Sequence, residues 1–568
     1  MELLIERDGF SLSSDNVAFS LRGDVTPVVD GVLCTLTVTG EIPVPVIERG
    51  DRLLLPVNEG LAIDADGEYA SNDINMSRIR GRLCGREGTM SMIVVQRGGK
   101  YLLISPAHGE NVLYSAIKED GLYALRMEAE KESRVTYGIF DRLVDACQCY
   151  RALRGTPPVT LTEKLRDNPE IRSLIGGAIV WVWGDNYKDV MYSQENVDLS
   201  PAVGREVVTV AERLHRGGID RALFGIFFDE DAVYVPELYE KYGYIATQYD
   251  NYDDAFDPAM LEIVPSNRVR NCDYTRRRMI DHPDGLALDG AGKVVPAWAI
   301  RGFDGAMHPL SKVCPRVAAR RIREEIPRIL QKYPAYRGRF LDVYGGGVRD
   351  CYHPDHLLTK EECVDVKREA FSFLRRDLSL VTGTEDGFDG ILDGLVYSEG
   401  MHSPVHYRAK DSGRHYVDRY DAVRETQAEQ NMLSPRCRVP LWQLTYHDCL
   451  FSFPYWGDST AASHRLLRQR ILFACLYGCP PLYSFSAKDF DEVEADVLES
   501  YHAIRAVTER VALLPMTDYA VLSEDYMLQR TVFGDEIEVW VNFADETRDF
   551  EGVTVAPQDV LVRVLQKK

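Results

Sequence analysis

Carboxylate side chains recur at short intervals between residues 340 and 403. Asp342 lies in FLDVYGGG, Glu385 and Asp386 end LVTGTED, and Glu399 ends LVYSE. Each apolar run leads into glycine within three residues, as a strand that ends in a loop does. Two carboxyl groups that face each other can act as acid and nucleophile on a glycosidic bond. The spacing therefore predicts cleavage of a glycoside.

Asp342 is the candidate nucleophile. An ionised aspartate inside an apolar strand is costly unless it faces a polar cavity. Gly345, Gly346 and Gly347 follow it, and three glycines leave room for the close approach of a ligand. An aspartate that only caps the next loop is the structural alternative. We expect Asp342 to attack the anomeric carbon and to form a covalent glycosyl-enzyme.

Glu385 and Glu399 compete for the role of general acid/base. Adjacent strands lie about 4.8 Å apart, so Asp342 and Glu385 on neighbouring strands can reach the roughly 5–5.5 Å of a retaining enzyme. Glu385 is then the acid, with its pKa raised while Asp342 is anionic. If Glu399 acts instead, across about 6.5–9.5 Å, the enzyme inverts. The glutamate that is not the acid is expected to bind substrate.

Other residues close the remaining predicted strands and are candidates for sugar binding. Aromatic rings stack on the apolar face of a sugar, and acidic side chains accept hydrogen bonds from its hydroxyl groups. The predicted substrate-binding residues are Trp181, Trp183, Asp229, Tyr249, Asp250, Tyr344, Asp386, Glu399, His402 and His447.

Metal binding has little support in the residue spacing. The pairs His353/His356 and His402/His406 each contain a proline, which places them on loops rather than on one helical face. A loop histidine that binds substrate or backbone is favoured over a metal ligand. The twelve cysteines include no CxxC pair, so reduced thiols are expected rather than a zinc site. The chemistry requires no cofactor.

These residues need a scaffold of parallel strands. Between residues 178 and 485, β-type runs alternate with helical patterns, which is typical of βα units. The eight candidate strands are 178–183, 222–228, 244–250, 339–345, 378–385, 394–399, 439–446 and 480–485. Eight is the number that a (β/α)8 barrel requires, and its active site lies at the C-terminal ends of the strands.

The fold class predicted is multidomain, with one α/β domain and two β domains. Residues 1–145 alternate short β runs with turns and predict a β-sandwich. A helical linker follows over 146–177, then the TIM-like barrel over 178–511 and a small C-terminal β domain over 512–568. The long interval 251–314 is expected to wall one side of the site.

Composition excludes several classes of partner. The formal net charge is −22 with no long basic run, so nucleic acid and anionic membrane are poor partners. No apolar stretch reaches 18 residues, and the N-terminus lacks a basic segment before its apolar run. We therefore expect a cytoplasmic protein whose partner is a carbohydrate substrate. Its oligomeric state is not indicated.

The ordered set FLDVYGGG, CYHPDH, LVTGTEDGFDG and SEG resembles glycoside hydrolase family 129 and its relative, family 101. The resemblance rests on residues 340–403 and on the order of the domains. It implies a retaining α-N-acetylgalactosaminidase that acts on GalNAc linked to Ser/Thr in mucin-type glycans, with Asp342 as nucleophile and Glu385 as acid/base. It also implies a divalent cation, such as Ca²⁺, near the site.

Two other functions fit parts of the sequence. A different α-glycosidase, such as an α-galactosidase, would use the same pair of carboxylates. A non-catalytic carbohydrate-binding protein would use the same aromatic and acidic residues, but it would not need two apposed carboxylates. A metal-dependent amidohydrolase requires His-x-His after the first strand, where this chain has Trp181-Val182-Trp183.

Overall fold

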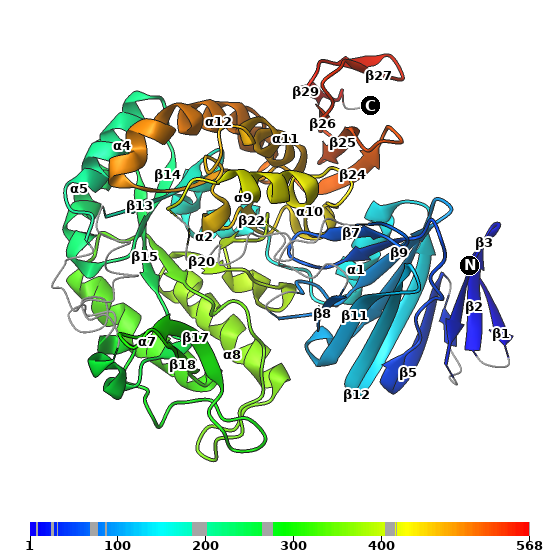
Figure 1. Ribbon diagram of the computed structural model, residues 1–568, viewed down its shortest axis with the longest axis horizontal. Helices are drawn as coiled ribbons and strands as arrows, with labels where there is room; N and C mark the ends of the chain where they lie inside the picture. Colours follow the sequence, from blue (N-terminus) through cyan, green and yellow to red (C-terminus); the bar gives the residue numbers. More distant parts are fainter. Residues whose placement is uncertain are drawn as a thin grey trace.

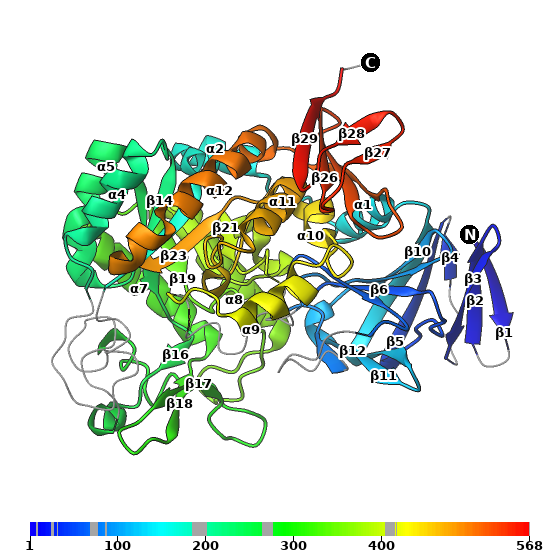
Figure 2. The ribbon, with the colours of Figure 1, turned by 45° about the horizontal axis from the view of Figure 1, so that its top comes forward.

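Along the sequence, an α/β region separates β-rich N-terminal and C-terminal regions, and Figure 1 shows the N-terminal strands to the right of the α/β region and the C-terminal strands at the upper right. The structure, a computed structural model, describes residues 1–6, 9–23, 28–30, 32–68, 78–85, 88–184, 202–263, 276–403, 415 and 417–566. In both ribbon views the N-terminal strands lie on one side of the α/β region (Figures 1 and 2). The mixed α/β, multidomain class predicted from the sequence is therefore correct.

The N-terminal region is built from two antiparallel sheets. The smaller is β1 (Glu2–Glu6), β2 (Gly9–Ser14) and β3 (Val17–Arg22). The larger contains β4 (Val28–Asp30), β5 (Leu33–Ile42), β6 (Arg52–Leu55), β7 (Leu61–Asp64), β8 (Arg78–Arg82), β9 (Ile93–Arg97), β10 (Lys100–Pro106), β11 (Val112–Glu119) and β12 (Leu122–Phe140). Phe10 and Tyr137 meet edge to face between the sheets, with ring centroids 5.9 Å apart. The sandwich arrangement stays a prediction.

Eight parallel strands form a nearly closed barrel. They are β13 (Ala178–Trp183), β14 (Ala222–Ile226), β15 (Ile245–Asp250), β19 (Gly338–Leu341), β20 (Val381–Glu385), β21 (Tyr397–Glu399), β22 (Phe451–Phe453) and β23 (Leu482–Ser486). Their order is β22-β21-β20-β19-β15-β14-β13-β23. Residues 459 and 460, which follow β22 in the chain, bind β23: the Thr460 amide donates to Leu482 O at 2.8 Å, and the Ser484 amide donates to Ser459 Oγ at 3.1 Å.

One predicted barrel strand is wrong. Residues 439–446 contain the helix α10 (Leu441–Tyr446), and the seventh strand is β22, which begins five residues after this helix. Every residue of the helix is buried, so the alternation that distinguishes a strand from a helix is missing. Pro440 precedes the helix, where its missing amide donor costs no hydrogen bond.

Helices cover the outside of the barrel. They include α4 (Glu206–Arg216), α5 (Val235–Tyr242), α7 (Pro315–Lys332), α8 (Lys360–Ser372), α11 (Leu467–Tyr477) and α12 (Phe490–Val511), with the short α9 (Ala422–Gln427) beside them. The helix α2 (Leu161–Asp167) lies in the predicted linker, and α1 (Leu143–Leu153) begins three residues before it. Thr359 and Glu362 form a capping box at the start of α8.

Two smaller β elements complete the chain. The interval after β15 contains β16 (Asp254–Ala255), β17 (Pro296–Arg301) and β18 (Met307–Lys312), a small sheet that projects from the barrel (Figure 2). The C-terminal sheet is β24 (Met516–Val521), β25 (Leu528–Phe533), β26 (Ile537–Asn542) and β29 (Asp559–Val564), with a hairpin of β27 (Arg548–Phe550) and β28 (Val553–Val555).

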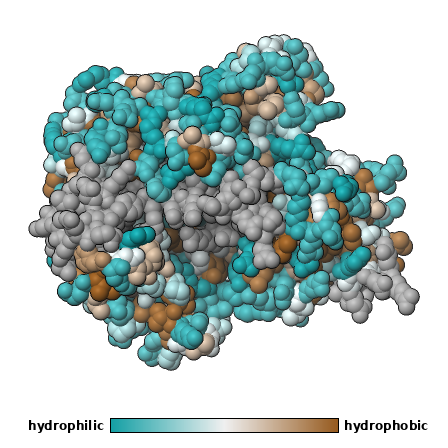
Figure 3. Space-filling model, in the orientation of Figure 1, coloured by the Kyte–Doolittle hydropathy of each residue, from teal (hydrophilic) through white to brown (hydrophobic). Residues whose placement is uncertain are grey.

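The face drawn in Figure 3 is mostly polar, as the composition of a charged globular protein predicts, and its apolar residues form small separate patches. Over the described part of the chain, no helix combines the length and the apolar character needed to span a bilayer. Cytoplasmic location stays a prediction.

Candidate active site

Strand register brings three carboxylates to one end of the barrel. Glu385 of β20 pairs with Glu399 of β21, and Asp342 follows Leu341, which pairs with Thr384. Phe340, Gly383 and Tyr397 form the row two residues earlier on the same strands. Phe340 and Tyr397 lie in one core cluster with Trp181, Tyr249 and Trp456. Because side chains alternate along a strand, the carboxylates extend from the same inner face.

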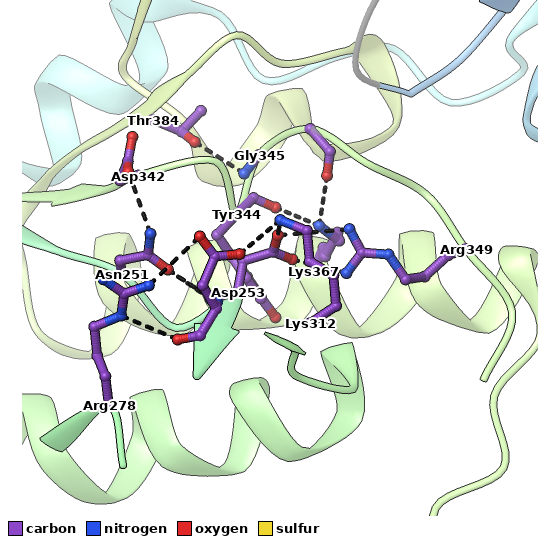
Figure 4. A network of polar contacts seen from close by, with 12 residues as sticks. Asn251, Asp253, Arg278, Lys312, Asp342, Tyr344, Gly345, Arg349, Lys367 and Thr384 are labelled. Atoms are coloured by element: carbon purple, nitrogen blue, oxygen red, sulfur yellow. Dashed lines mark hydrogen bonds and ion pairs between the residues drawn. The ribbon is translucent and has the colours of Figure 1, made fainter. Parts of the chain in front are cut away.

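Asp342 sits in a hydrogen-bonded, nearly buried position. Tyr249 Oη donates to Oδ2 at 2.5 Å, and Asn251 Nδ2 donates to the same atom at 3.2 Å (Figure 4). Burial raises the pKa of Asp342, while hydrogen bonds from Glu385 and Tyr249 oppose this rise. The residue is 8% exposed. Asn251 is a partner of Asp342 that the sequence did not single out.

Glu385 is the partner of Asp342 across adjacent strands. A hydrogen bond between two carboxyl groups requires that one of them carry a proton. The contact with Glu385 lowers the pKa of Asp342, but burial outweighs this effect and keeps that pKa above its ordinary value. The pair can therefore divide acid and nucleophile roles between its members.

Glu399 lies one strand further away and is held by Trp181. The indole Nε1 of Trp181 donates to both carboxylate oxygens at 3.1 Å. Burial raises the pKa of Glu399 well above its ordinary value, Trp181 opposes the rise, and Asp342 adds to it. A glutamate that is 1% exposed and keeps its proton is a hydrogen-bonding group rather than an anion.

Glu399→Gln tests this interpretation. A neutral amide replaces a neutral carboxyl, so we expect kcat/KM to fall by no more than about 10-fold. Glu399→Ala is the comparison, because it leaves the Trp181 indole without its acceptor. A loss in Glu399→Gln as large as that of a general acid, about 10² to 10⁴-fold, would instead make Glu399 the acid/base.

The same variant should change the pH dependence of stability. The folded pKa of Glu399 is raised, so its contribution to the free energy of unfolding is complete below the unfolded pKa and is lost as pH rises toward the folded pKa. Glutamine has no proton to lose. We therefore expect the difference in Tm, variant minus wild type, to be more positive at pH 8 than at pH 5. Equal differences at the two pH values would contradict the assignment.

A strained turn follows Asp342. Val343 has a φ of +49°, and the Tyr344 amide donates to Asp342 O at 2.6 Å. A positive φ is costly for a β-branched residue and persists only where its surroundings enforce it. The amide of Gly345 donates to Thr384 Oγ1 at 2.9 Å, and a Cβ at Gly345 would lie 2.3 Å from the Thr384 side chain. Gly345 thus serves close packing of the turn.

Lys367 of α8 holds this turn from beneath (Figure 4). Its Nζ donates to Tyr344 O at 2.5 Å and to Gly346 O at 2.7 Å. The side chain is fully buried, and burial lowers the pKa of Lys367 to about 8. Lys367 is a positioning residue for Asp342 that no sequence motif indicated.

Lys367→Met should lower kcat by about 10- to 100-fold with little change in KM, because a shift of the nucleophile by about 1 Å is enough for such a loss. Lys164→Met is the matched control. Lys164 is equally buried, donates to three backbone carbonyls (Leu392, Leu395 and Cys449), and has its pKa lowered to about 8 by burial. Kinetics and Tm of both variants check the prediction, and equal kcat losses would contradict it.

Acidic residues beside the turn are neutralised by cations. Asp253 accepts from Arg349 Nη1 at 2.9 Å and pairs with Lys312, which also reaches Asp254 at 2.7 Å. Burial would raise the pKa of Asp253, but Arg349 and Lys312 outweigh it and lower the pKa. Similarly, Arg339 and Arg277 offset burial and lower the pKa of Asp250.

The expected calcium ion finds no matching donor set in the described residues. The two clusters able to hold a metal there contain sulfur and imidazole donors, whereas calcium prefers six to eight oxygens. The Asp253 carboxylate is already paired with two cations. His406 of the second histidine pair lies outside the described residues. The divalent cation implied by the family resemblance stays a prediction.

Two predicted binding residues, Tyr344 and His447, are buried against protein groups. The Tyr344 ring packs against Phe371 with centroids 5.6 Å apart, and the Lys367 ammonium lies 4.6 Å from the centroid of the Tyr344 ring. His447 follows α10 rather than a strand, and its ring contacts the carbonyls of Leu514 and Gly478 at 2.7 and 3.3 Å. The reason for predicting His447, its place after the seventh strand, is therefore wrong.

The predicted aromatic residues fill the barrel. Trp181 and Trp183 stack with centroids 5.8 Å apart, and each is 1% exposed. Trp183 Nε1 donates to Ser484 Oγ at 3.0 Å. Asp229 accepts from Gln248 at 2.5 Å and from Arg277 at 2.8 Å. In this structure these rings and this carboxylate face protein groups, and Tyr249 is the predicted aromatic residue that contacts Asp342.

A loop of the N-terminal region reaches the strand ends. Asn58 donates to Asp386 Oδ1 at 3.1 Å, so Asp386 points toward this loop. Glu59 is fully buried and lies 2.7 Å from His402 Nδ1 and 2.6 Å from Arg438 Nε. Burial would raise the pKa of Glu59, but Arg438 and His402 outweigh it and lower the pKa. The sequence assigned no role to this loop, because its partners lie more than 300 residues away.

The family comparison places this geometry among glycosidases. A family model described as glycosyl hydrolases related to the GH101 family, GH129, matches residues 213–532. That is more than half of the chain and includes all three carboxylates. No curated protein matches the chain.

Solved structures with the same fold include an enzyme from Bifidobacterium bifidum. Its ligand-free α-N-acetylgalactosaminidase NagBb is 18% identical, with a TM-score of 0.69 over 95% of this chain and 97% of that chain. The GalNAc complex of NagBb is 17% identical, with a TM-score of 0.68 over 99% and 98% of the two chains. At this identity the likeness establishes the fold.

Proposed function

The chain belongs to glycoside hydrolase family GH129, and from this premise we propose that it is a retaining exo-α-glycosidase that releases α-linked N-acetylgalactosamine. GalNAc joined to Ser/Thr of mucin-type glycans is the proposed substrate. The observation that carries the proposal is the contact between Asp342 and Glu385 at the ends of adjacent parallel strands. The shared fold with the B. bifidum α-N-acetylgalactosaminidase supports the choice of sugar.

In the first step, Glu385 donates a proton to the glycosidic oxygen while Asp342 attacks the anomeric carbon. The bond to the aglycone breaks, and an α-glycoside becomes a β-linked glycosyl-enzyme. Tyr249 and Asn251 hold Asp342 Oδ2 and fix the orientation of the carboxylate. Preorganised donors of this kind avoid reorganisation during the reaction.

In the second step, Glu385 acts as a base. It removes a proton from a water molecule that attacks the anomeric carbon, the bond to Asp342 breaks, and the α-sugar is released with net retention. The proton that Glu385 gains restores it as the acid for the next cycle. No step requires a metal ion.

Strand spacing favours Glu385 over Glu399 as the acid/base. Asp342 and Glu385 come from neighbouring strands, about 4.8 Å apart at the backbone, which suits the separation of retaining carboxylates. Glu399 lies a further strand away and its carboxyl is held by Trp181. An inverting pair of Asp342 and Glu399 would leave the Asp342–Glu385 contact without a role.

Hydrolysis of p-nitrophenyl α- and β-glycosides, with and without EDTA, tests the proposal. We expect release from the α-N-acetylgalactosaminide, with α-GalNAc as the first product in proton NMR. Release from the α-galactoside alone would keep the mechanism and replace the sugar. A β-anomer as first product would contradict retention. Binding of GalNAc without turnover on p-nitrophenyl or mucin-type glycopeptide substrates would favour the carbohydrate-binding alternative.

A further inference from the structure

A buried cluster of two cysteines and one histidine lies apart from the carboxylates. Cys314, Cys351 and His356 each present one donor atom, and these atoms all lie within 4.8 Å of one another. Cys351 Sγ is 3.5 Å from His356 Nδ1, and all three residues are buried. The cysteines are free thiols. They come from segments that are 37 residues apart, so no motif spacing reveals the cluster.

The imidazole is oriented as a metal ligand. His356 Nε2 lies 3.0 Å from the carbonyl oxygen of Asp284, and only a protonated nitrogen can donate there. The lone pair of Nδ1 therefore faces Cys351. Metal-ligating histidines usually donate their second N–H to a carboxylate or backbone carbonyl, which fixes the tautomer and the ring.

Cys314 places its sulfur beside the segment that carries the other two donors. Cys314 is the N-cap of α7, but its side chain makes no capping hydrogen bond, and its Sγ lies 3.5 Å from the carbonyl oxygen of His356. Burial and the neighbouring Cys351 raise the pKa of Cys314 to about 12. A cation between the two sulfurs would supply the positive charge that ionised thiols need in a buried site.

We propose that Cys314, Cys351 and His356 bind one structural zinc ion. Two thiolates and one imidazole are the donors that zinc takes in tetrahedral sites, and sulfur ligands select against calcium and magnesium. The fourth position is left to water or to His353, whose ring stacks on that of His356 with centroids 4.0 Å apart. The proposal does not depend on the identity of the sugar.

The second cluster with suitable donors is not such a site. Glu59, His402 and Cys479 also converge, but Arg438 donates to Glu59 and lies 3.0 Å from His402 Nδ1. A guanidinium already supplies the positive charge there. Among the described residues, the donor atoms of the Cys314 cluster have no hydrogen bond from an arginine or lysine side chain.

The ion would join two segments that flank the active site. Cys351 lies nine residues after Asp342, on the loop that leads from the strained turn to α8. Cys314 and Asp284 belong to the interval between β15 and α7, and the Cys314 amide donates to Gly285 O at 2.9 Å. Binding to the folded state alone would stabilise this junction.

Metal analysis of the purified full-length chain tests the site. Inductively coupled plasma mass spectrometry should find about one zinc ion per chain, as three converging protein ligands predict. Cys351→Ser and His356→Ala should lose the zinc. Cys475→Ser is the matched control, because Cys475 is a buried cysteine on α11 outside the cluster. Zinc that persists in both cluster variants would overturn the proposal.

A spectroscopic measurement on the wild-type chain avoids dependence on variants that fail to fold. After removal of zinc by a chelator, added Co²⁺ should give thiolate-to-cobalt charge-transfer absorption and the intense visible bands of tetrahedral cobalt. Zinc should abolish these bands and should protect Cys314 and Cys351 from alkylation. Absence of zinc together with absence of cobalt bands, or a disulfide between the two cysteines, would overturn the proposal.

Discussion

Asp342→Ala should lower kcat/KM by about 10⁴- to 10⁶-fold, the scale of loss when a covalent nucleophile is removed. The backbone of the turn should persist, because Lys367 and Thr384 hold its carbonyl and amide groups without the Asp342 carboxyl. Azide should restore part of the turnover by attacking the anomeric carbon in place of the carboxylate. The product should be a β-glycosyl azide, because a single displacement inverts an α-glycoside.

Asp386→Ala is the control for Asp342→Ala. Asp386 lies at the same end of the barrel, directly after Glu385, but its carboxylate contacts Asn58 of the N-terminal region. We expect its kcat/KM to stay within a few-fold of wild type, and a large loss would instead support the prediction that Asp386 binds the sugar. Far-UV circular dichroism and Tm should separate catalytic from structural loss. Full turnover in Asp342→Ala, or an α-glycosyl azide from it, would refute its role as nucleophile.

Glu385→Ala should lose about 10²- to 10⁴-fold in turnover of natural glycosides, the usual contribution of general acid/base catalysis. The loss should be smaller for p-nitrophenyl glycosides, because nitrophenolate leaves with little protonic assistance. With such substrates the glycosyl-enzyme should accumulate and give a burst of nitrophenolate. Azide should then attack the β-linked intermediate and release an α-glycosyl azide, the opposite anomer to that from Asp342→Ala.

The two azide products distinguish the candidate acids. Glu399→Ala should give no azide product of either anomer, since Glu399 is proposed to act through its hydrogen bond to Trp181. An α-glycosyl azide from Glu399→Ala and none from Glu385→Ala would reverse the assignment. The acidic limb of the wild-type pH profile for kcat/KM should report Asp342, and the basic limb should vanish in Glu385→Ala.

The position of the carboxylates at strand ends could be predicted from the sequence because the signal is local. A short, mostly apolar run such as FL or LVTGT that stops at a carboxylate and then reaches glycine marks both a buried strand and its end. Seven of the eight predicted barrel strands overlap observed strands for this reason. Residues 439–446 failed because a fully buried helix lacks the polar face that would reveal its period.

The partners of these carboxylates were decided by the tertiary structure. Strand order places Tyr249 beside Asp342 and Trp181 opposite Glu399, and no spacing along the chain encodes such pairs. The contact of Glu59 with His402 spans 343 residues, and Lys367 reaches its carbonyls from a helix. Sequence by itself determined which residue types stand at the barrel mouth, since strand patterning is a short-range property. Folding decided which of them carry, share or lack a proton, because pKa values depend on burial and on neighbours that are distant in sequence.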